Sequence, residues 1–244
     1  MTRSRAKTKI EGDMRLEQKV SENPRAFRSR TSETHMRIRD AVISGKLKPG
    51  TKLKIEHLSR EIGVGATPIR EALSSLVSDG LVVREDQRGF RVAGISGREF
   101  DELLHVRSFV EERALRLSIE RGGPEWEEGI VVALYRLQSI APSETYDPAW
   151  EGCHREFHLA LNAGSGSETL LRLCSQFFDE NSRYRHLSRY GGTAPRSVTD
   201  EHEGIAEAAL ARDADLAVEK LMTHYNRTGK LLRQALQDAD EAAD

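Results

Sequence analysis

The chain has 244 residues, and its 37 Lys and Arg side chains nearly balance its 39 Asp and Glu, for a net charge of −2. That balance conceals a split, because residues 1–97 carry 20 basic and 12 acidic side chains, whereas residues 98–244 carry 17 basic and 27 acidic ones. A length of this size fits two domains. The charge split indicates a basic module that meets a polyanion, joined to an acidic module with another task.

Composition also excludes several classes of protein. Hydrophobic residues make up 38% of the chain, and no apolar run approaches the roughly 20 residues needed to span a bilayer. The N-terminus is basic but lacks the apolar core of a signal peptide. Two cysteines, Cys153 and Cys174, do not imply a disulfide framework. We therefore expect a cytoplasmic protein without a membrane partner.

Residues 1–30 hold nine Lys and Arg and four Asp and Glu, with few apolar residues and no sustained period. Such a segment cannot bury enough surface to offset the entropy of ordering. We expect a flexible basic tail. A DNA-contacting arm and an extension without a role remain equal alternatives for it.

The pattern of residues 31–96 predicts a small domain of three short helices and two strands. Helical patterns end at Gly45 and Gly63, and a third helix is expected to begin with Thr67 as its cap and Pro68 in its first turn. Two strand-like runs, 81–83 and 90–92, follow and are joined by a turn that contains Arg88 and Gly89. Two helices with a tight turn and then a β-hairpin describe a winged helix-turn-helix.

This arrangement predicts which side chains meet DNA. In such folds the second helix of the pair enters the major groove with its N-terminal residues at the bases, which selects Thr67 and Arg70. Arg70 can pair with two acceptors of a guanine or with a phosphate. Further contacts to phosphates are expected from Arg60, Lys52, Lys54, Arg88 and the wing residue Gly89. For any single basic residue, a plain solvated position is an equal alternative.

From Gly97 onward the pattern is almost wholly helical. Apolar residues keep a 3.6-residue period from Phe100 to Leu117, and further helices are expected over about 125–139, 148–163, 167–189, 197–211 and 214–237. Short connections favour an antiparallel bundle of about six helices over residues 97–240. The fold class is therefore mostly α, with a small β-hairpin wing in the N-terminal domain.

Four histidines fall in a pattern typical of a shared site. His154 and His158 lie four residues apart on one helix face. His202 and His224 each lie 11 residues from Asp213, so two antiparallel helices joined there would bring them to the same height. Four inward imidazoles can bind a divalent metal such as Zn²⁺ or Ni²⁺. Separate hydrogen-bonded core histidines remain the alternative on spacing alone.

Residues 44–92 resemble the DNA-binding domain of GntR-family transcriptional regulators. The resemblance rests on the turn 45–50 (GKLKPG), the helix 67–73 (TPIREAL), the exit 79–82 (DGLV) and the wing pair Arg88-Gly89. Arg70 matches the second recognition arginine of that family. One departure is that Gly65-Ala66 stands where the family usually has Ser-Arg, so an arginine that commonly contacts DNA is missing.

In the C-terminal half, the pairs Phe157-His158 and Glu201-His202 and the run 213–224 follow a recognisable pattern. They resemble the FCD ligand-binding domain of the FadR subgroup of that family. The resemblance implies a metal bound by one Asp and three His, and His158, His202 and His224 match those three histidines. His154 stands where the Asp usually stands. This departure fits either an all-histidine site that favours a softer metal or a branch that has lost the metal.

The same resemblance implies a small organic acid as effector. Arg107 lies on an apolar-bordered helix side and matches an effector-contacting arginine, although a helix salt bridge to Glu111 would also explain it. Arg183 and Arg185 form a second candidate cluster for a carboxylate.

We therefore expect a ligand-responsive, homodimeric regulator that binds operator DNA, represses a metabolic operon and has no enzymatic role. One alternative is a metal sensor in which the ion itself is the effector. Another is a metal-dependent hydrolase, for which no acid lies at a justified spacing from the four histidines. The effector, the operator and the choice between repression and activation stay open.

Overall fold

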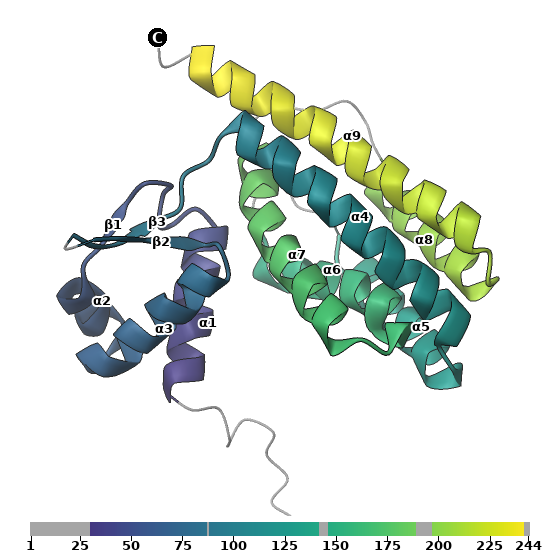
Figure 1. Cartoon of the computed structure of the whole chain (residues 1–244), viewed down its shortest axis with the longest axis horizontal. Coiled ribbons are helices and arrows are strands. Elements are labelled where there is room, and N and C mark those ends of the chain that lie inside the picture. Colours follow the sequence, from purple (N-terminus) through teal and green to yellow (C-terminus); the bar gives the residue numbers. More distant parts are fainter. Residues whose placement is uncertain (1–29, 87, 142–145, 189–196, 242–244) are drawn as a thin grey trace, which may run out of the picture.

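The computed structural model describes residues 30–86, 88–141, 146–188 and 197–241. The chain forms a small N-terminal domain and a larger helical bundle that lie side by side (Figure 1). The expected tail, residues 1–30, lies outside the described residues apart from Arg30. No helix among the described ranges is long and apolar enough to cross a membrane.

The N-terminal domain contains three helices and a three-stranded sheet within the residues described. Its elements are α1 (Arg30–Ile43), β1 (Lys52–Leu53), α2 (Ile55–Ile62), α3 (Ala66–Ser78), β2 (Val82–Glu85) and β3 (Gly89–Val92). The sheet is antiparallel in the order β1-β3-β2. The wing is thus larger than the expected hairpin, because Lys52 and Leu53 pair with Arg91 and Phe90.

Local sequence explains where these helices begin and end. Gly63 ends α2 in the left-handed conformation, with φ of 78°, which glycine adopts without steric cost. Our expectation that Thr67 caps α3 is wrong. The N-cap is Gly65 in an extended conformation, without a side-chain hydrogen bond, so Thr67 lies inside the first turn.

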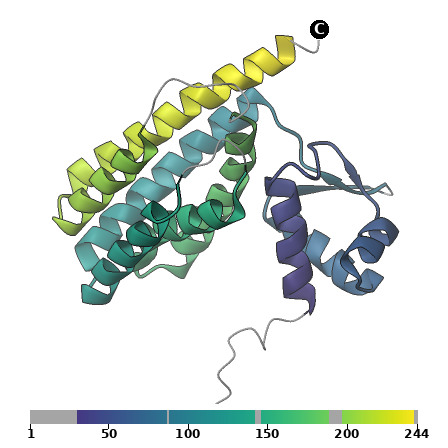
Figure 2. The same cartoon turned by 180° about the vertical axis from the view of Figure 1, so that it is seen from behind.

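The bundle confirms the predicted helices. It contains α4 (Gly97–Arg121), α5 (Pro124–Gln138), α6 (Pro148–Asn162), the short 3-10 helix η1 (Ala163–Ser165), α7 (Glu168–Ser188), α8 (Val198–Leu210) and α9 (Ala214–Glu241). Helices α4 and α9 run side by side in both views (Figures 1 and 2). Ser96 and Ser197 cap α4 and α8 through their side chains, which satisfies backbone N–H groups that lack partners in the helix.

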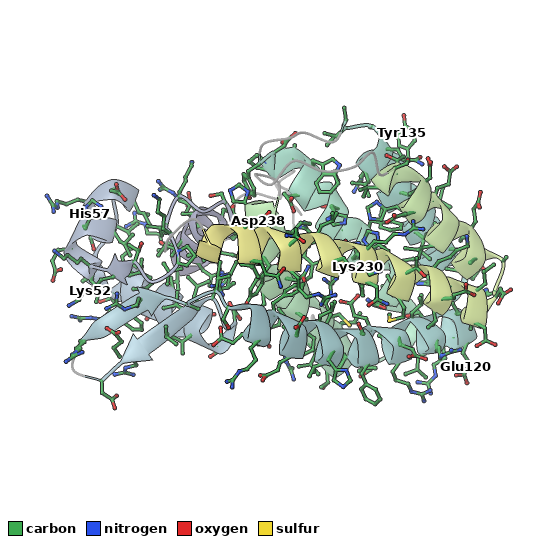
Figure 3. The ribbon with its side chains drawn as sticks, turned by 90° about the horizontal axis from the view of Figure 1, so that it is seen from above. Lys52, His57, Glu120, Tyr135, Lys230 and Asp238 are labelled. Carbon is green, nitrogen blue, oxygen red and sulfur yellow. The ribbon has the colours of Figure 1, made fainter. Side chains whose placement is uncertain are left out.

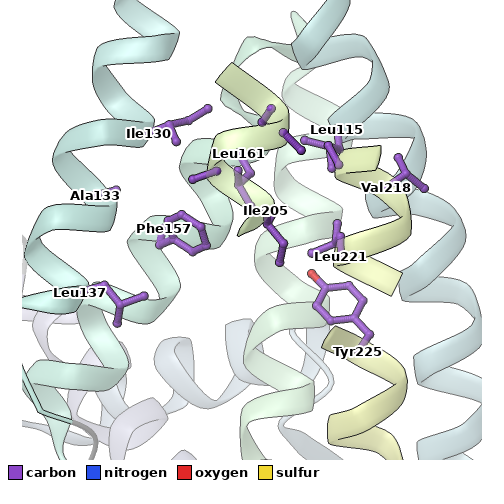
Figure 4. Close-up of a cluster of buried hydrophobic side chains, with 14 of the residues drawn as sticks. Leu115, Ile130, Ala133, Leu137, Phe157, Leu161, Ile205, Val218, Leu221 and Tyr225 are labelled. Carbon is purple, nitrogen blue, oxygen red and sulfur yellow. The ribbon is translucent and has the colours of Figure 1, made fainter. Parts of the chain in front are cut away.

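The bundle core combines an apolar cluster with a group of buried polar side chains. Phe157, Ile205, Leu221 and Tyr225 converge between the helices (Figure 4). Next to this cluster the interior holds buried polar side chains, which need partners because an unpaired buried polar group costs free energy. These side chains are Arg107, Glu111, His154, His158, His202 and His224.

Candidate DNA-binding surface and metal centre

The predicted DNA-contacting residues all lie exposed on the N-terminal domain. Thr67 and Arg70 lie on the first turns of α3, one turn apart, and both are exposed. Neither Gly65 nor Ala66 places a charged group there. Arg70 is therefore the basic side chain that the start of α3 offers.

The wing and α2 supply the other predicted contacts. Arg88 and Gly89 lie exposed at the turn between β2 and β3, where Gly89 has φ of +94° and open space around its Cα. Lys52 lies on β1 and Arg60 on α2, and both are exposed. Figure 3 shows Lys52 and His57 at the end of the molecule away from the bundle. These basic side chains are thus exposed on the N-terminal domain.

The four predicted histidines come together in the bundle. Nε2 of His154 lies 3.0 Å from Nε2 of His158 and 3.2 Å from Nε2 of His202. One nitrogen from each of His154, His158, His202 and His224 lies within 4.8 Å of the others, and all four residues are buried. Four ligands at 2.0–2.1 Å from a tetrahedral zinc ion are roughly 3.3 Å apart, and the two distances from His154 are close to that spacing.

The environment keeps His154 and His158 neutral. Burial lowers the pKa of His154 and of His158 well below the usual value, and the charge of Arg185 and the neighbouring histidines act in the same direction. A neutral imidazole offers a lone pair to a metal, whereas a protonated one does not. Nδ1 of His154 is buried without a hydrogen-bond partner in the described structure. The donor set fits a divalent transition metal.

Surrounding groups orient two of the histidines. Nδ1 of His224 lies 2.8 Å from Oε2 of Glu201, and Oε1 of Glu201 accepts from Arg227 at 2.9 Å. A carboxylate on Nδ1 directs Nε2 toward the cluster and makes it a better ligand. On the other side, Nδ1 of His158 lies 3.4 Å from the Tyr225 hydroxyl.

Arg107 is buried beside the cluster in a closed network. Its Nε donates to Glu111 at 2.6 Å, which is the helix salt bridge that the sequence also allowed, and its Nη2 donates to the Tyr225 hydroxyl at 2.9 Å. The guanidinium also lies 4.1 Å from the centre of the Tyr225 ring. Tyr225 in turn donates to Glu111. Burial raises the pKa of Tyr225 well above its usual value, so this hydroxyl keeps its proton.

The two arginines of the second predicted cluster separate. Arg185 lies 5.1 Å from the centre of the Phe178 ring, which contacts His154 and His158, and it bonds Glu151 and Ser182. Arg183 points the other way and donates to backbone carbonyls of the N-terminal domain. Two residues that are two positions apart on a helix point about 200° apart. Because Arg183 points away from the cluster, we no longer propose it as an effector contact.

A groove of about 730 Å³ between α8 and α9 leads to the cluster. Its lining includes Ser197, Asp200, Glu201, Lys220, His224, Arg227 and Lys230. His224 thus belongs both to the buried histidine cluster and to the wall of an open groove.

Family models match most of the chain. The model for bacterial regulatory proteins of the gntR family matches residues 30–92, and the FCD domain model matches residues 102–227. The chain belongs to the GntR family. Its N-terminal domain is a GntR helix-turn-helix, and its bundle is an FCD domain.

Named relatives of this GntR-family chain are transcriptional regulators. It is 34% identical to the regulator BphR of Paraburkholderia xenovorans (strain LB400), over 85% of this chain and 86% of BphR. It is 32% identical to the transcriptional repressor GlaR of Escherichia coli (strain K12), over 82% of this chain and 94% of GlaR. Among solved structures, E. coli McbR/YncC shares the fold with a TM-score of 0.70 and 24% identity, over 85% of this chain and 98% of that one.

Several residues around the site were not found from the sequence. Tyr225 and Phe178 line the cluster, and no sequence feature marked either of them. The i+1 spacing of Tyr225 from His224 carries no signal by itself, because neighbours on a helix point about 100° apart. Only the packing of α4, α7 and α9 shows that both side chains face the site.

Proposed function

We propose that this GntR-family regulator binds a divalent metal at His154, His158, His202 and His224 and responds there to a small carboxylate. The convergence of four buried imidazole nitrogens within 4.8 Å carries the proposal. Buried polar groups need partners, and Nδ1 of His154 is buried without one in the described structure. A bound ion would supply the positive charge to which a carboxylate binds.

The donor set indicates the kind of metal. Four neutral imidazoles add no negative charge, and imidazole suits Zn²⁺ and Ni²⁺ better than Mg²⁺ or Ca²⁺. The ion would therefore keep its full double charge. The guanidinium carbons of Arg107 and Arg185 lie 5.6 Å and 5.1 Å from the centre of the Phe178 ring. Each arginine is paired with a carboxylate, Glu111 or Glu151, so the positive charge that favours a carboxylate effector would come from the ion. We propose placement within the FadR subgroup on the resemblance of the C-terminal domain alone.

We propose that the N-terminal domain binds operator DNA through the start of α3 and the wing. Thr67 and Arg70 would read bases, while Lys52, Arg60, Arg88 and the backbone of Gly89 would meet phosphates. The names of relatives such as the repressor GlaR and the gluconate operon repressor of Bacillus licheniformis support repression. Repression of a metabolic operon is the proposed outcome.

We propose that the regulator is a homodimer joined through the outer face of α4. Phe109 on this face is 74% exposed, the largest such fraction among the described large hydrophobic residues. Glu102 and Arg116 lie seven residues to either side of Phe109, and Arg98 and Glu120 lie eleven. Two antiparallel copies of α4 related by a two-fold axis at Phe109 would thus pair opposite charges, as a self-complementary interface requires.

A metal-sensing regulator is the second candidate, because the cluster is complete without any organic ligand. A hydrolase has less support. Glu201 is bonded to His224 and Arg227, and Glu156 lies exposed beside Arg136 at 3.5 Å. Neither carboxylate is placed to activate a metal-bound water, and we propose no catalytic role.

DNA-binding measurements separate these functions. An operator fragment can be selected from random DNA with the purified protein and then titrated with metal alone, carboxylates alone and both together. The proposal expects a change in operator affinity that needs both metal and carboxylate. A full response to metal alone favours the sensor, and a carboxylate response in the absence of metal contradicts the proposed site.

A further inference from the structure

One buried carboxylate connects the DNA-binding domain to both helices beside the histidine cluster. Asp179 on α7 is 7% exposed. From the N-terminal domain, Arg39 on α1 donates through Nε to Oδ2 at 2.9 Å and through Nη2 to Oδ1. From the bundle, Arg155 on α6 donates through Nε to Oδ1 at 2.9 Å. Asp179 thus binds two arginines that belong to different domains.

Both bundle partners in this network adjoin the histidine cluster. Arg155 follows His154 directly on α6, the helix that also carries His158. Asp179 follows Phe178, whose ring centre lies 5.3 Å from that of His154 and 5.5 Å from that of His158. Any movement of α6 against α7 at the cluster therefore changes the geometry at Asp179.

Helix α7 also contacts the N-terminal domain through a second arginine. Arg183, one turn after Asp179, donates to the carbonyls of Gly80, Ala93 and Gly94, which lie after α3 and after the wing. Near the end of α1, a Cβ on Gly45 would come within 3.2 Å of the His186 ring. The junction is close-packed, so the two domains cannot shift without disturbing these contacts.

We propose that Asp179 is a positioning residue that couples occupancy of the histidine cluster to the placement of the DNA-binding domain. The inference rests on the proposed metal site. Binding to His154 and His158 sets the position of α6, α6 sets Arg155, and Arg155 shares Oδ1 of Asp179 with Arg39. Because such coupling is reciprocal, a change in the bonds between Arg39 of α1 and Asp179 also changes the affinity of the cluster for metal. A ligand can act in this way only if the two arrangements bind it differently.

Hydrogen exchange on the full-length protein tests this coupling with Zn²⁺ as the probe. Zinc is expected to protect α6, α8 and α9 in the wild type and also to change exchange in α1, residues 30–43, by about 5-fold or more, the low end of allosteric coupling. Asp179→Asn and Arg155→Gln should keep the protection around the cluster and lose the response of α1. Arg155→Gln leaves the pair of Arg39 and Asp179 intact, so it remains informative if Asp179→Asn does not fold.

Asp40→Asn is the matched control, because Asp40 also bonds Arg39 but is exposed and belongs to α1 itself. This variant should respond like the wild type. A wild-type protein that binds zinc without a response in α1 overturns the coupling alone. An α1 response that persists in Arg155→Gln also overturns it. A wild-type protein that binds no zinc overturns the proposed metal site and this inference with it.

Discussion

His224 on α9 presents Nδ1 to Oε2 of Glu201 on α8 at 2.8 Å. An ionised carboxylate is only an acceptor, so His224 donates from Nδ1 and its Nε2 keeps a lone pair. Glu201 thus sets the tautomer of one member of the cluster. Because Glu201 also accepts from Arg227, its charge stays compensated at the wall of the groove.

Loss of this carboxylate should weaken metal binding. Glu201→Gln is expected to lower zinc affinity by about 10–100-fold, the usual effect of removing a group that orients a metal-bound histidine. Competition titration with a chromophoric chelator measures the change. Glu203→Gln, an exposed carboxylate on the same helix, is the control, and an equal loss in both variants would point to general electrostatics instead.

His158→Ala should strip the metal while the protein stays folded. The imidazole is one of the four in the cluster, and its loss leaves three nitrogens and a small cavity. Elemental analysis measures the loss of metal, and circular dichroism measures whether the helices remain folded. His105→Ala removes an exposed histidine from α4 and should leave the metal content unchanged. Full metal content in His158→Ala would refute this ligand.

His154→Asp should change metal preference. This substitution introduces the Asp that the resemblance to FCD domains implies at this position. An oxygen ligand suits harder ions such as Mn²⁺. The ratio of Mn²⁺ to Ni²⁺ affinity is expected to rise relative to the wild type. Calorimetric titration of both ions into both proteins measures it. An unchanged ratio would mean that His154 does not ligate the ion.

The metal-free protein should lose stability as the solution becomes acidic. Burial lowers the pKa of His154 and His158 in the folded state from the ordinary value of 6.5. The unfolded chain therefore binds more protons below about pH 6.5, so the stability present above that pH falls as pH decreases. Melting temperatures from pH 8 to pH 5 with a chelator test this. His154→Phe should flatten the profile, and an equally steep profile would contradict the assignment.

Arg70→Ala should weaken operator binding by about 1–3 kcal/mol if its guanidinium pairs with a base. Fluorescence anisotropy with the selected operator measures the loss. Arg172→Ala is the control, because Arg172 is an exposed arginine on α7 in the bundle. Unchanged operator affinity in Arg70→Ala would contradict the proposed docking of α3.

Phe109→Glu should convert the proposed homodimer to a monomer, because it places two like charges at the two-fold axis. Tyr135→Glu on α5 is a matched control, since Tyr135 is 72% exposed and lies on another helix. Analytical ultracentrifugation distinguishes the two states. A Phe109→Glu dimer, or a monomeric wild type, would rule out the α4 face.

Much of the fold and part of the site were predictable from local patterns. Periodicity and breakers located the helices. Helix geometry predicted that His154 would meet His158, and the turn at Asp213 predicted that His202 would meet His224. These features depend only on residues close in sequence or on one short turn.

The remaining features depend on contacts between distant segments. Strand β1 exists because Lys52 and Leu53 pair with β3, and Arg183 faces the N-terminal domain because of how the two domains pack. Arg39 and Asp179 lie 140 residues apart in sequence. No spacing rule relates such positions, so the sequence alone could not predict the interdomain network.

The central claim is that the histidine cluster holds a metal through which the domain responds to a carboxylate. Thermal unfolding with a panel of small carboxylates, with zinc and after chelation, tests it most directly, because a ligand of the folded state raises the melting temperature by mass action. The account predicts that a carboxylate stabilises the zinc-loaded wild type and has no effect after chelation or in His158→Ala. The same stabilisation without zinc would contradict it.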